Sequence, residues 1–430
     1  MLQQVVFILI LATAVYFIRK RALFITANIF LGKKNAIEGN AKERWMNVLM
    51  VAFGQKKMFK NPLPALLHLC IYVGFLVINL EVLEFVIDGI AGTHRIFAPY
   101  LGSFYNVLMN VFEFLAVAVL LACVVFLLRR NIIKVERFQS PEITGWARLD
   151  ANLILFSEII LMTAILTMNA ADQVLQTQDS HYTSTGALFF SSYLTSTLQH
   201  LNASTLIFIE RFAWWFHIIG ILGFAVYITY SKHLHIFLAF FNTYYAKLQP
   251  KGHINNMPVV TNEVKSMLGL APAPEATSTP GRFGAKDIND LSWNNLLAAY
   301  SCTECGRCTA GCPANLTGKK LSPRKIMMDV RDRMEEVGSS GKGFDDGKSL
   351  LNDYITKEEI NACTSCNACV EACPVLINPL EIILELRRYV AMEESGAPAS
   401  WNSMFQNIET NFAPWKFSPS DRFNWKEIKP

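Results

Sequence analysis

Five long apolar runs limit the folds open to this chain, because each approaches or exceeds the length of about 20 residues that crosses the hydrocarbon core of a bilayer. Only 17% of the 430 residues are charged, whereas soluble domains are nearer one-quarter charged. We therefore predict a transmembrane domain over residues 1–250. Its spans are expected at residues 3–18, 63–90, 103–128, 151–176 and 205–230.

The basic residues are distributed unevenly between the segments that connect these runs. Ten Lys and Arg residues follow the first run and five follow the third, whereas segment 91–102 has one and segment 177–204 has none. Since positively charged connections stay in the cytoplasm, we predict that the N-terminus lies outside and the C-terminus inside. His94, His181 and His200 then fall in or near outer loops and are expected to be solvated.

After the apolar runs, the composition becomes first that of a linker and then that of a soluble domain. Residues 251–284 are expected to form a linker, because they include a stretch rich in Pro, Ala and Gly. Residues 285–395 have the composition of a soluble domain, with helical apolar spacing over 289–300 and 379–392. A Ser-Pro pair at 322–323 predicts the start of another helix.

The last segment, residues 396–430, is an aromatic tail. Tryptophan is frequent at the centre of protein interfaces, so the tail is expected to dock a partner. Packing back onto its own soluble domain is the alternative. The tryptophans concerned are Trp401, Trp415 and Trp425.

Eight of the ten cysteines form two runs with the same spacing, Cys-x2-Cys-x2-Cys-x3-Cys-Pro. Three thiolates of a run can surround one [4Fe–4S] cluster while the fourth reaches the other cluster. Structural zinc is the alternative for four-cysteine sites, but it does not explain the third cysteine and the Cys-Pro pair, each present twice. The predicted ligands are Cys302, Cys305, Cys308 and Cys373 for one cluster, and Cys363, Cys366, Cys369 and Cys312 for the other.

Three histidines in or beside the apolar runs are candidate cofactor ligands. His68 and His235 both lie near the cytoplasmic ends of their spans, so they can meet across one haem b. His217 lies 18 residues before His235, which on one continuous helix is five turns, or about 27 Å, along the same face. His217 could then serve a second haem or a quinone, whereas His233 would face away. Hydrogen bonding to helix carbonyls or headgroups is the alternative role for these histidines.

These predictions define an all-α fold. We expect a five-helix transmembrane cytochrome b bundle plus a cytoplasmic α-helical dicluster ferredoxin domain. The two cysteine runs begin 61 residues apart (363 − 302), and the segment between them has helical patterning.

The apolar spans resemble the cytochrome b subunit of respiratory nitrate reductase, on the residues around His68 and in the stretch 231–235. The resemblance implies that His68 and His235 are the proximal haem ligands and that His217 is one distal ligand. Ile78 stands where the family has its second distal histidine. One haem b is therefore expected, and a second is left open.

Over essentially its whole length, the chain is similar to membrane iron–sulfur proteins of the heterodisulfide-reductase-like group. That group includes oxidoreductases thought to link electron-transfer flavoprotein to menaquinone. In many of its members a cysteine-rich CCG domain follows, but this sequence has no CCG motif. The resemblance implies a separate CCG-domain iron–sulfur partner (heterodisulfide reductase B-like), electron-transfer flavoprotein as a further partner, and a place in the bacterial cytoplasmic membrane.

The expected function is that of an oxidoreductase subunit that relays electrons between the quinone pool and a cytoplasmic partner, with no catalytic residue of its own and no nucleic-acid partner. Transfer from electron-transfer flavoprotein to menaquinone is favoured over quinol-driven disulfide reduction. A redox sensor and a redox-driven ion pump are further alternatives. The pump would use carboxylates within the spans, namely Glu81, Glu84, Glu113 and Glu158.

Overall fold

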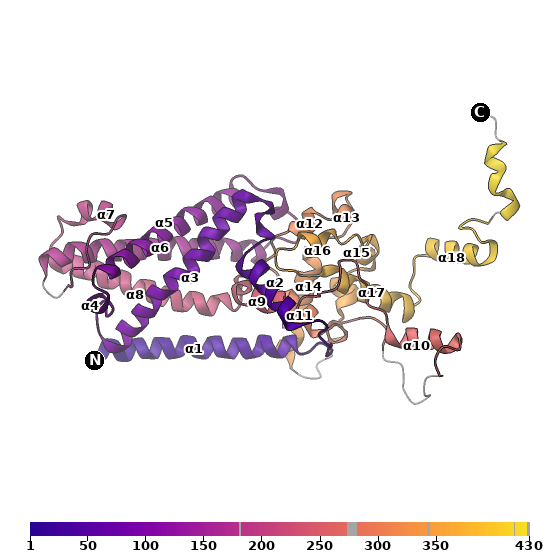
Figure 1. The fold of residues 1–430 in the computed structure, drawn as a ribbon, viewed down its shortest axis with the longest axis horizontal. Helices are drawn as coiled ribbons and strands as arrows, with labels where there is room; N and C mark the ends of the chain where they lie inside the picture. The colour runs from indigo at the N-terminus through magenta and orange to yellow at the C-terminus, as the bar shows by residue number, and fades with distance from the viewer. Residues whose placement is uncertain (180–181, 273–281, 342–344, 417, 428–430) are drawn as a thin grey trace.

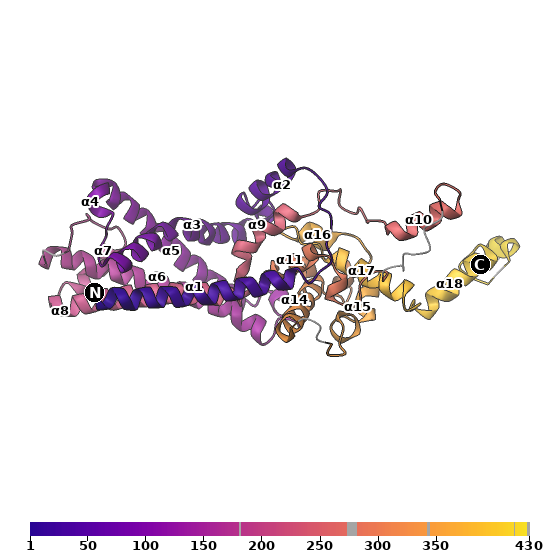
Figure 2. The same ribbon diagram turned by 90° about the horizontal axis from the view of Figure 1, so that it is seen from below.

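The chain folds into an elongated, helical molecule. In the described residues, the β-pairing is limited to the isolated bridges Lys33–Ser292 and Leu351–Ile355. Long helices occupy one end and the cysteine-containing elements lie next to them, as both views show (Figure 1, Figure 2). The computed structural model describes residues 1–179, 182–272, 282–341, 345–416 and 418–427.

Five helices are long and apolar enough to cross a membrane, which confirms the number of spans predicted. Side chains such as Leu9, Leu80 and Phe114 are exposed on their outer surfaces, as expected where a helix bundle meets lipid. We call these helices the membrane bundle: α1 (Leu2–Ile29), α3 (Pro62–Ala91), α5 (Ser103–Asn131), α6 (Trp146–Gln178) and α8 (Ala203–Ile228).

The first and fifth of these helices differ from the predicted spans. Helix α1 has 28 residues and continues well beyond residue 18. Helix α8 ends at Ile228, and a turn at 229–231 separates it from the short 3-10 helix η4 (Lys232–Leu234) and from α9 (His235–Tyr245). The Ser231 hydroxyl accepts a hydrogen bond from the backbone N–H of His233 at 3.0 Å, which stabilises this new start. The assumption of one continuous helix from His217 to His235 is therefore wrong.

Shorter elements connect the long helices. On the side of the cysteines lies a segment in which α2 is followed by a π-helical turn, η1. The 3-10 turn η2 follows on the same side, directly before α3. Of the remaining connections, α4 and α7 cap the opposite end of the bundle and η3 lies between α5 and α6. Their bounds are α2 (Ala41–Asn47), η1 (Val48–Phe53), η2 (Met58–Lys60), α4 (Ala98–Leu101), η3 (Glu136–Phe138) and α7 (Ser191–Leu198).

We call residues 285–395 the cysteine-rich unit. Its core is formed by fully buried side chains of α14 and α17, such as Ile326 and Ile382. The helices predicted at the Ser-Pro pair and at 379–392 are confirmed. The elements are η5 (Ile288–Asp290), α11 (Trp293–Tyr300), α12 (Arg307–Ala310), α13 (Pro313–Leu316), α14 (Pro323–Ser340), the irregular turn η6 (Leu350–Tyr354), α15 (Lys357–Ala362), α16 (Ala368–Ala372) and α17 (Pro379–Met392).

The cysteine-rich unit and the membrane bundle share one apolar core. Ile25 and Ile29 of α1 belong to the same buried cluster as the side chains of α11 and α14. Polar contacts support this junction, since the Asn28 amide donates to the Tyr300 hydroxyl at 2.9 Å. The cysteine-rich unit is therefore packed directly against one end of the bundle.

Two amphipathic helices project from the cysteine-rich unit on the side away from the bundle, α10 (Pro258–Met267) and α18 (Ala399–Asn411), and α18 is followed by η7 (Pro419–Lys426) (Figure 1, Figure 2). The tail tryptophans Trp401, Trp415 and Trp425 are all exposed. In the described part of the tail, these tryptophans are therefore not buried against the core of the unit.

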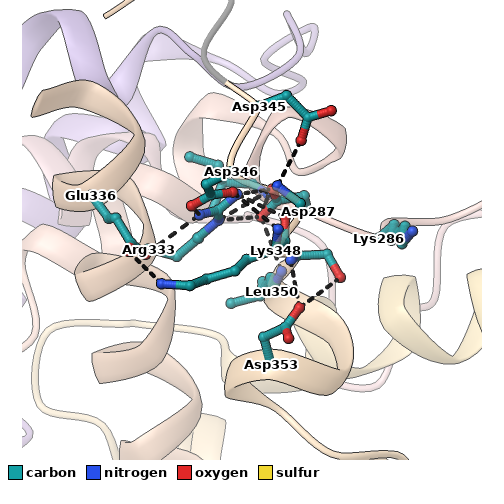
Figure 3. Close-up of polar contacts among 12 residues, drawn as sticks. Lys286, Asp287, Arg333, Glu336, Asp345, Asp346, Lys348, Leu350 and Asp353 are labelled. Atoms are coloured by element: carbon teal, nitrogen blue, oxygen red, sulfur yellow. Dashed lines mark hydrogen bonds and ion pairs between the residues drawn. The ribbon is translucent and has the colours of Figure 1, made fainter. Parts of the chain in front are cut away.

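Arg333 organises the polar side of α14 (Figure 3). Its guanidinium group lies within 2.6–3.1 Å of carboxylate oxygens of Asp287 and Asp346, and it also donates to the Lys348 carbonyl at 2.9 Å. The side chain is only 4% exposed. Charged groups with this many hydrogen bonds are costly to separate, because each partner would remain without compensation.

Arg333→Ala is expected to destabilise the cysteine-rich unit by about 3 to 5 kcal/mol. The measurement is proteolysis in urea, with cleavage within residues 285–395 expected at a lower urea concentration than in the wild type. Arg282→Ala is the control, since Arg282 is half exposed in its ion pair with Asp290 and such pairs contribute about 1 kcal/mol or less. Equal sensitivity of the two variants would contradict the structural role of Arg333.

Candidate metal centres

Four cysteines from both runs line one cavity in the cysteine-rich unit. The empty space there, part of which is open to solvent, is about 380 Å³, and it is bounded further by Arg324 and Met327. Three of its cysteines come from the loop before α12 and from the start of α12, and the fourth is the cysteine of the Cys-Pro pair in the second run. They are Cys302, Cys305, Cys308 and Cys373.

The other four cysteines line a second cavity of about 300 Å³ between the same elements. Its apolar wall includes Leu321, Leu380 and Ile383. The structure therefore brings the cysteines together in the two crossed sets that the spacing predicts. The second set is Cys312, Cys363, Cys366 and Cys369.

The backbone repeats itself in the two runs. Glu304 and Ser365, at equivalent positions, both have φ of 55°. Two residues later, Gly306 and Asn367 have φ of 71° and 62°. Left-handed residues at these points curl the chain so that successive cysteines face one centre, and Gly and Asn are the residues that adopt this conformation most readily.

The thiols in these cavities are buried, which opposes their ionisation. Burial raises the pKa of Cys302 to about 12 and that of Cys373 to about 11, so the empty thiols would be neutral. A thiolate ligand needs the positive charge of a metal centre to compensate this burial. The Ile377 N–H, 3.3 Å from Cys373 Sγ, donates to that sulfur, as is usual around iron–sulfur clusters.

Gly306→Ala is expected to weaken the first centre, because a Cβ there would lie 2.3 Å from Arg324 Nη1 on a backbone with φ of +71°. The strain of the left-handed backbone alone costs about 1 to 2 kcal/mol. The measurement is the rate at which cluster absorbance is lost under chelator. Gly311→Ala is the control, since its Cβ would meet only ordinary contacts at 3.4 Å or more. Equal rates in both variants would contradict the prediction.

Three imidazoles gather where the membrane bundle meets the cysteine-rich unit. The rings of His233 and His235 are 5.5 Å apart, and both lie close enough to His68 to interact with it electrostatically. Burial, with His235 beside it, lowers the pKa of His233 to about 3, and burial also lowers the pKa of His235. Neutral imidazole is the form that ligates metals.

The Nδ1 atoms of two of these histidines are held by oxygen acceptors. His68 Nδ1 lies 3.1 Å from Gln55 Oε1, and His235 Nδ1 lies 3.2 Å from the Lys232 carbonyl oxygen. An N–H on Nδ1 leaves the lone pair on Nε2, as in metal-ligating histidines with a second hydrogen bond. His68 and His235 could therefore each ligate a metal, such as a haem iron, through Nε2.

Gln55→Leu is expected to reduce haem retention about 10- to 100-fold, because the partner that orients a ligating imidazole contributes this much to metal affinity. The measurement is haem content after dilution or competition with apomyoglobin. Gln249→Leu is the control, because Gln249 lies in the segment after α9 and contacts Glu38 instead of a histidine. Normal retention in Gln55→Leu would exclude this role.

His217 lies apart from the other three, within the membrane bundle. It is 1% exposed, and its Nδ1 lies 2.9 Å from the Leu161 carbonyl oxygen. The Phe85 ring packs edge-on against it with 5.8 Å between ring centroids. Its Nε2 is thus also free to act as an acceptor or a ligand. In the described part of the chain, no second histidine faces it from α3, where Ile78 is buried.

An ion pair connects the histidine group to the first cavity. Lys232, which precedes His233, pairs with Glu304, and Glu304 lies between Cys302 and Cys305. The second Glu304 oxygen accepts from Arg331 Nη2 at 2.7 Å. Although burial opposes it, Arg331 and Lys232 hold the pKa of Glu304 below its usual value.

The sequence alone does not predict the contacts of Gln55 and Glu304. It also does not predict that His233 lies near His235 and His68. The prediction that His233 faces away depends on a continuous helix, and the signal against that helix is Ser231, a residue that often caps a new helix. Gln55 and Glu304 have no comparable signal, since each reaches its partner only through the tertiary fold.

The predictions for the remaining histidines had different outcomes. His200 is exposed, as expected, and His181 lies outside the described residues. His94 is not a solvated side chain: it is 25% exposed, and its Nε2 lies 3.3 Å from Asp172 Oδ1. The prediction was wrong because the loop after α3 folds back over the buried acids of the bundle.

Comparison with known proteins supports iron–sulfur clusters over structural zinc. Residues 301–377 match a family described as a 4Fe-4S dicluster domain. No solved structure matches the chain.

Curated relatives extend the similarity to the whole chain. The probable iron-sulfur-binding oxidoreductase FadF of Bacillus subtilis is 28% identical, over 99% of this chain and 61% of the relative. The EtfAB:quinone oxidoreductase of Syntrophomonas wolfei is 27% identical, over 92% of this chain and 56% of the relative. One component of the dihydromethanophenazine:CoB–CoM heterodisulfide reductase of Methanosarcina mazei is 29% identical, over 32% of this chain and 35% of the relative.

The chain spans about three-fifths of the length of the first two of these relatives. All three are oxidoreductases by name. The chain is therefore a relative of iron–sulfur oxidoreductases that carries a 4Fe–4S dicluster domain at residues 301–377 and five helices able to cross a membrane.

Proposed function

We propose that this protein is a membrane-bound electron-transfer subunit that relays electrons between the quinone pool and a cytoplasmic redox partner. The two cysteine sets would hold one [4Fe–4S] cluster each, and His68 and His235 would hold haem b. When bound, these groups accept and release single electrons. The observation that carries the proposal is that one end of the membrane bundle brings its histidines directly beside the first cysteine cavity.

Contacts across this junction support the relay. The Lys232–Glu304 ion pair connects the histidine loop to the loop of Cys302 and Cys305. Arg307, between Cys305 and Cys308, acts electrostatically on His68. The first cavity therefore lies nearer the membrane bundle in this arrangement, and the second would face the soluble partner.

The proposed direction of electron flow is based on the similarity of this chain to known proteins. A relative named EtfAB:quinone oxidoreductase favours transfer from electron-transfer flavoprotein to menaquinone. The similarity to a heterodisulfide reductase component supports the second candidate, quinol-driven disulfide reduction by a partner with CCG domains. The exposed tail with Trp401 and Trp425 is the proposed docking segment for that partner.

The proposed location is the bacterial cytoplasmic membrane, with the cysteine-rich unit in the cytoplasm. The positive charges that follow α1 and α5 lie at the end of the bundle that contacts this unit. The far end, capped by α4 and α7, would then face outward.

The test is purification with native partners, followed by optical and EPR quantification of haem and clusters and by an assay of menaquinone-analogue reduction with reduced electron-transfer flavoprotein. We expect one b-type haem, two [4Fe–4S] clusters and quinone reduction. Reduction of a disulfide substrate by quinol, without activity toward the flavoprotein, would favour the second candidate. Protein with zinc in place of iron would overturn the assignment.

A further inference from the structure

The second cysteine cavity reaches the surface of the protein. Cys366 is exposed, whereas the other seven cysteines of the two runs, all in the described part of the chain, are buried or half-buried. Thr364, which lines the same cavity, is exposed as well. An electron passes between two proteins only when their redox centres come close together. A soluble protein that exchanges electrons with a cluster in this cavity would therefore have to cover Cys366.

An exposed leucine lies on one side of this cavity. Leu316 is the last residue of α13, which begins directly after Cys312, and its side chain is 71% exposed. The chain then turns back on this short helix, since the Lys319 N–H donates to the Ala314 carbonyl at 3.0 Å. An apolar side chain with a charged neighbour is the usual pattern where the centre of a protein interface meets its rim.

Lysines border the cavity on two sides. On the side of α13, Lys319 lies two residues before Leu321, which lines the cavity. On the other side, Lys251 precedes Gly252, where a Cβ would lie 3.5 Å from the Asn367 amide nitrogen. Asn367 follows the exposed cysteine and also lines the cavity. The surface around that cysteine is therefore flanked by lysines from two remote segments of the chain.

The nearest carboxylate does not balance these lysines. Glu371 pairs with both Lys60 and Lys251, so that one negative charge serves two positive charges. Lys319 is exposed and has no carboxylate partner among the described residues. This part of the surface is therefore positively charged.

The carboxylates of α15 do not cancel this charge either. Glu358 pairs with Lys320 at 2.9 Å, and Glu359 is buried and pairs with Lys325 at 3.0 Å. An ion pair between exposed side chains, such as Lys320 with Glu358, contributes about 1 kcal/mol or less. An incoming carboxylate of another protein can therefore replace Glu358 at little cost.

A bound cluster would add negative charge of its own, since four thiolates surround it. The lysines could then compensate the cluster instead of attracting a partner. The two roles differ in what they control. Compensation of the cluster changes its midpoint potential, whereas attraction of a partner changes the rate of association and makes that rate depend on salt.

We propose that the surface around Cys366, with Leu316 and the lysines Lys251, Lys319 and Lys320, docks a small acidic protein that carries single electrons. One electron would pass between this carrier and the second cluster, so that one is oxidised and the other reduced by one electron, and no bond is made or broken. The electron transfer rests on the proposed function, whereas the docking does not. None of these residues belongs to the aromatic tail, so the site differs from the docking segment proposed for the CCG-domain partner.

Electron transfer from the chemically reduced protein to an acidic acceptor tests this proposal. The full-length protein, in nanodiscs of uncharged phosphatidylcholine, is reduced with dithionite, desalted and mixed in a stopped-flow instrument with oxidised rubredoxin, an acidic iron protein that accepts one electron. We expect the second-order rate constant to fall about 10-fold or more from low to high ionic strength, because salt screens the attraction. Cytochrome c, a basic one-electron acceptor, should show the opposite dependence on salt.

Charge reversal identifies the surface that is used. Lys251→Glu combined with Lys319→Glu should slow the reaction with rubredoxin about 10- to 100-fold at low salt, and it should accelerate the reaction with cytochrome c. Lys265→Glu combined with Lys416→Glu is the matched control, since these exposed lysines lie in α10 and in the tail and their reversal changes the net charge equally. Leu316→Ser should slow the reaction with rubredoxin at every salt concentration.

Two results would overturn the proposal while the relay stands. One is an equal effect, or no effect, of the two charge-reversed double variants on the rate with rubredoxin. The other is a shift of the cluster midpoint potential in Lys251→Glu with Lys319→Glu without a change in that rate, which would assign these lysines to compensation of the cluster.

A binding measurement separates the docking from the relay. If the protein contains no clusters, the relay fails, and an NMR titration with zinc-substituted rubredoxin, which is redox-inactive, still tests the docking. Shifts of the rubredoxin resonances that disappear in Lys251→Glu with Lys319→Glu, but remain in the control, would support the site. Absence of such shifts with the wild-type protein would overturn it.

Discussion

Cys373→Ser is expected to remove the cluster bound with Cys302, Cys305 and Cys308, although Cys373 belongs to the other sequence run. All four thiols line the same cavity, and Cys373 is 8% exposed there. A serine oxygen is a poorer ligand for iron than a thiolate, so about half of the iron should be lost. Because the first cavity lies next to the histidines, electron transfer to the partner should stop.

Alkylation followed by mass spectrometry identifies the cluster that is lost. In Cys373→Ser, Cys302, Cys305 and Cys308 should become reactive, while Cys312, Cys363 and Cys369 stay protected. Cys70→Ser is the control, since Cys70 lies in α3 away from both cavities, and it should keep all the iron. Reactivity of Cys363 and Cys369 instead would mean that each run binds its own cluster.

The second prediction with a large expected effect is the loss of the proposed haem b. His68→Ala and His235→Ala should each abolish the b-type absorbance, because these two residues would together hold the proposed haem iron. Electron exchange between quinol and the clusters should then fall below detection. Reduced-minus-oxidised optical spectra of purified membranes provide the measurement.

His233, which lies beside His68 and His235, provides the control. His233→Ala should keep the haem, because His233 has no hydrogen bond that orients its ring toward a metal among the described residues, whereas His235 Nδ1 is held by the Lys232 carbonyl. Haem loss in His233→Ala together with retention in His235→Ala would reverse the assignment. Substitution of the exposed His253 by Ala should leave the b-type absorbance unchanged in the same assay.

Features that depend on local sequence could be predicted. A transmembrane helix needs only a run of apolar residues, because its backbone hydrogen bonds are satisfied within the segment. The crossed sets Cys302–Cys373 and Cys363–Cys312 follow from the spacing, in which the fourth cysteine of each run is set apart by three residues and reaches the other cluster. Ser322 before Pro323 likewise determines a helix start by local chemistry, and the structure confirms that helix.

Contacts between distant segments could not be predicted in this way. The turn after Ile228 changes the direction of every later side chain, which is why His233 lies beside His235 and His68. The pairing of Lys232 with Glu304 joins residues that are 72 positions apart.

The sequence by itself therefore determined the kinds of ligand in this protein and the class of its helices, because spacing and hydrophobicity act over a few residues. Only the tertiary structure decided which ligands are neighbours, which carboxylates have donors, and that the Glu81 Oε1 atom has none among the described residues. The physical reason is that burial and charge compensation depend on groups that the chain brings together from remote positions.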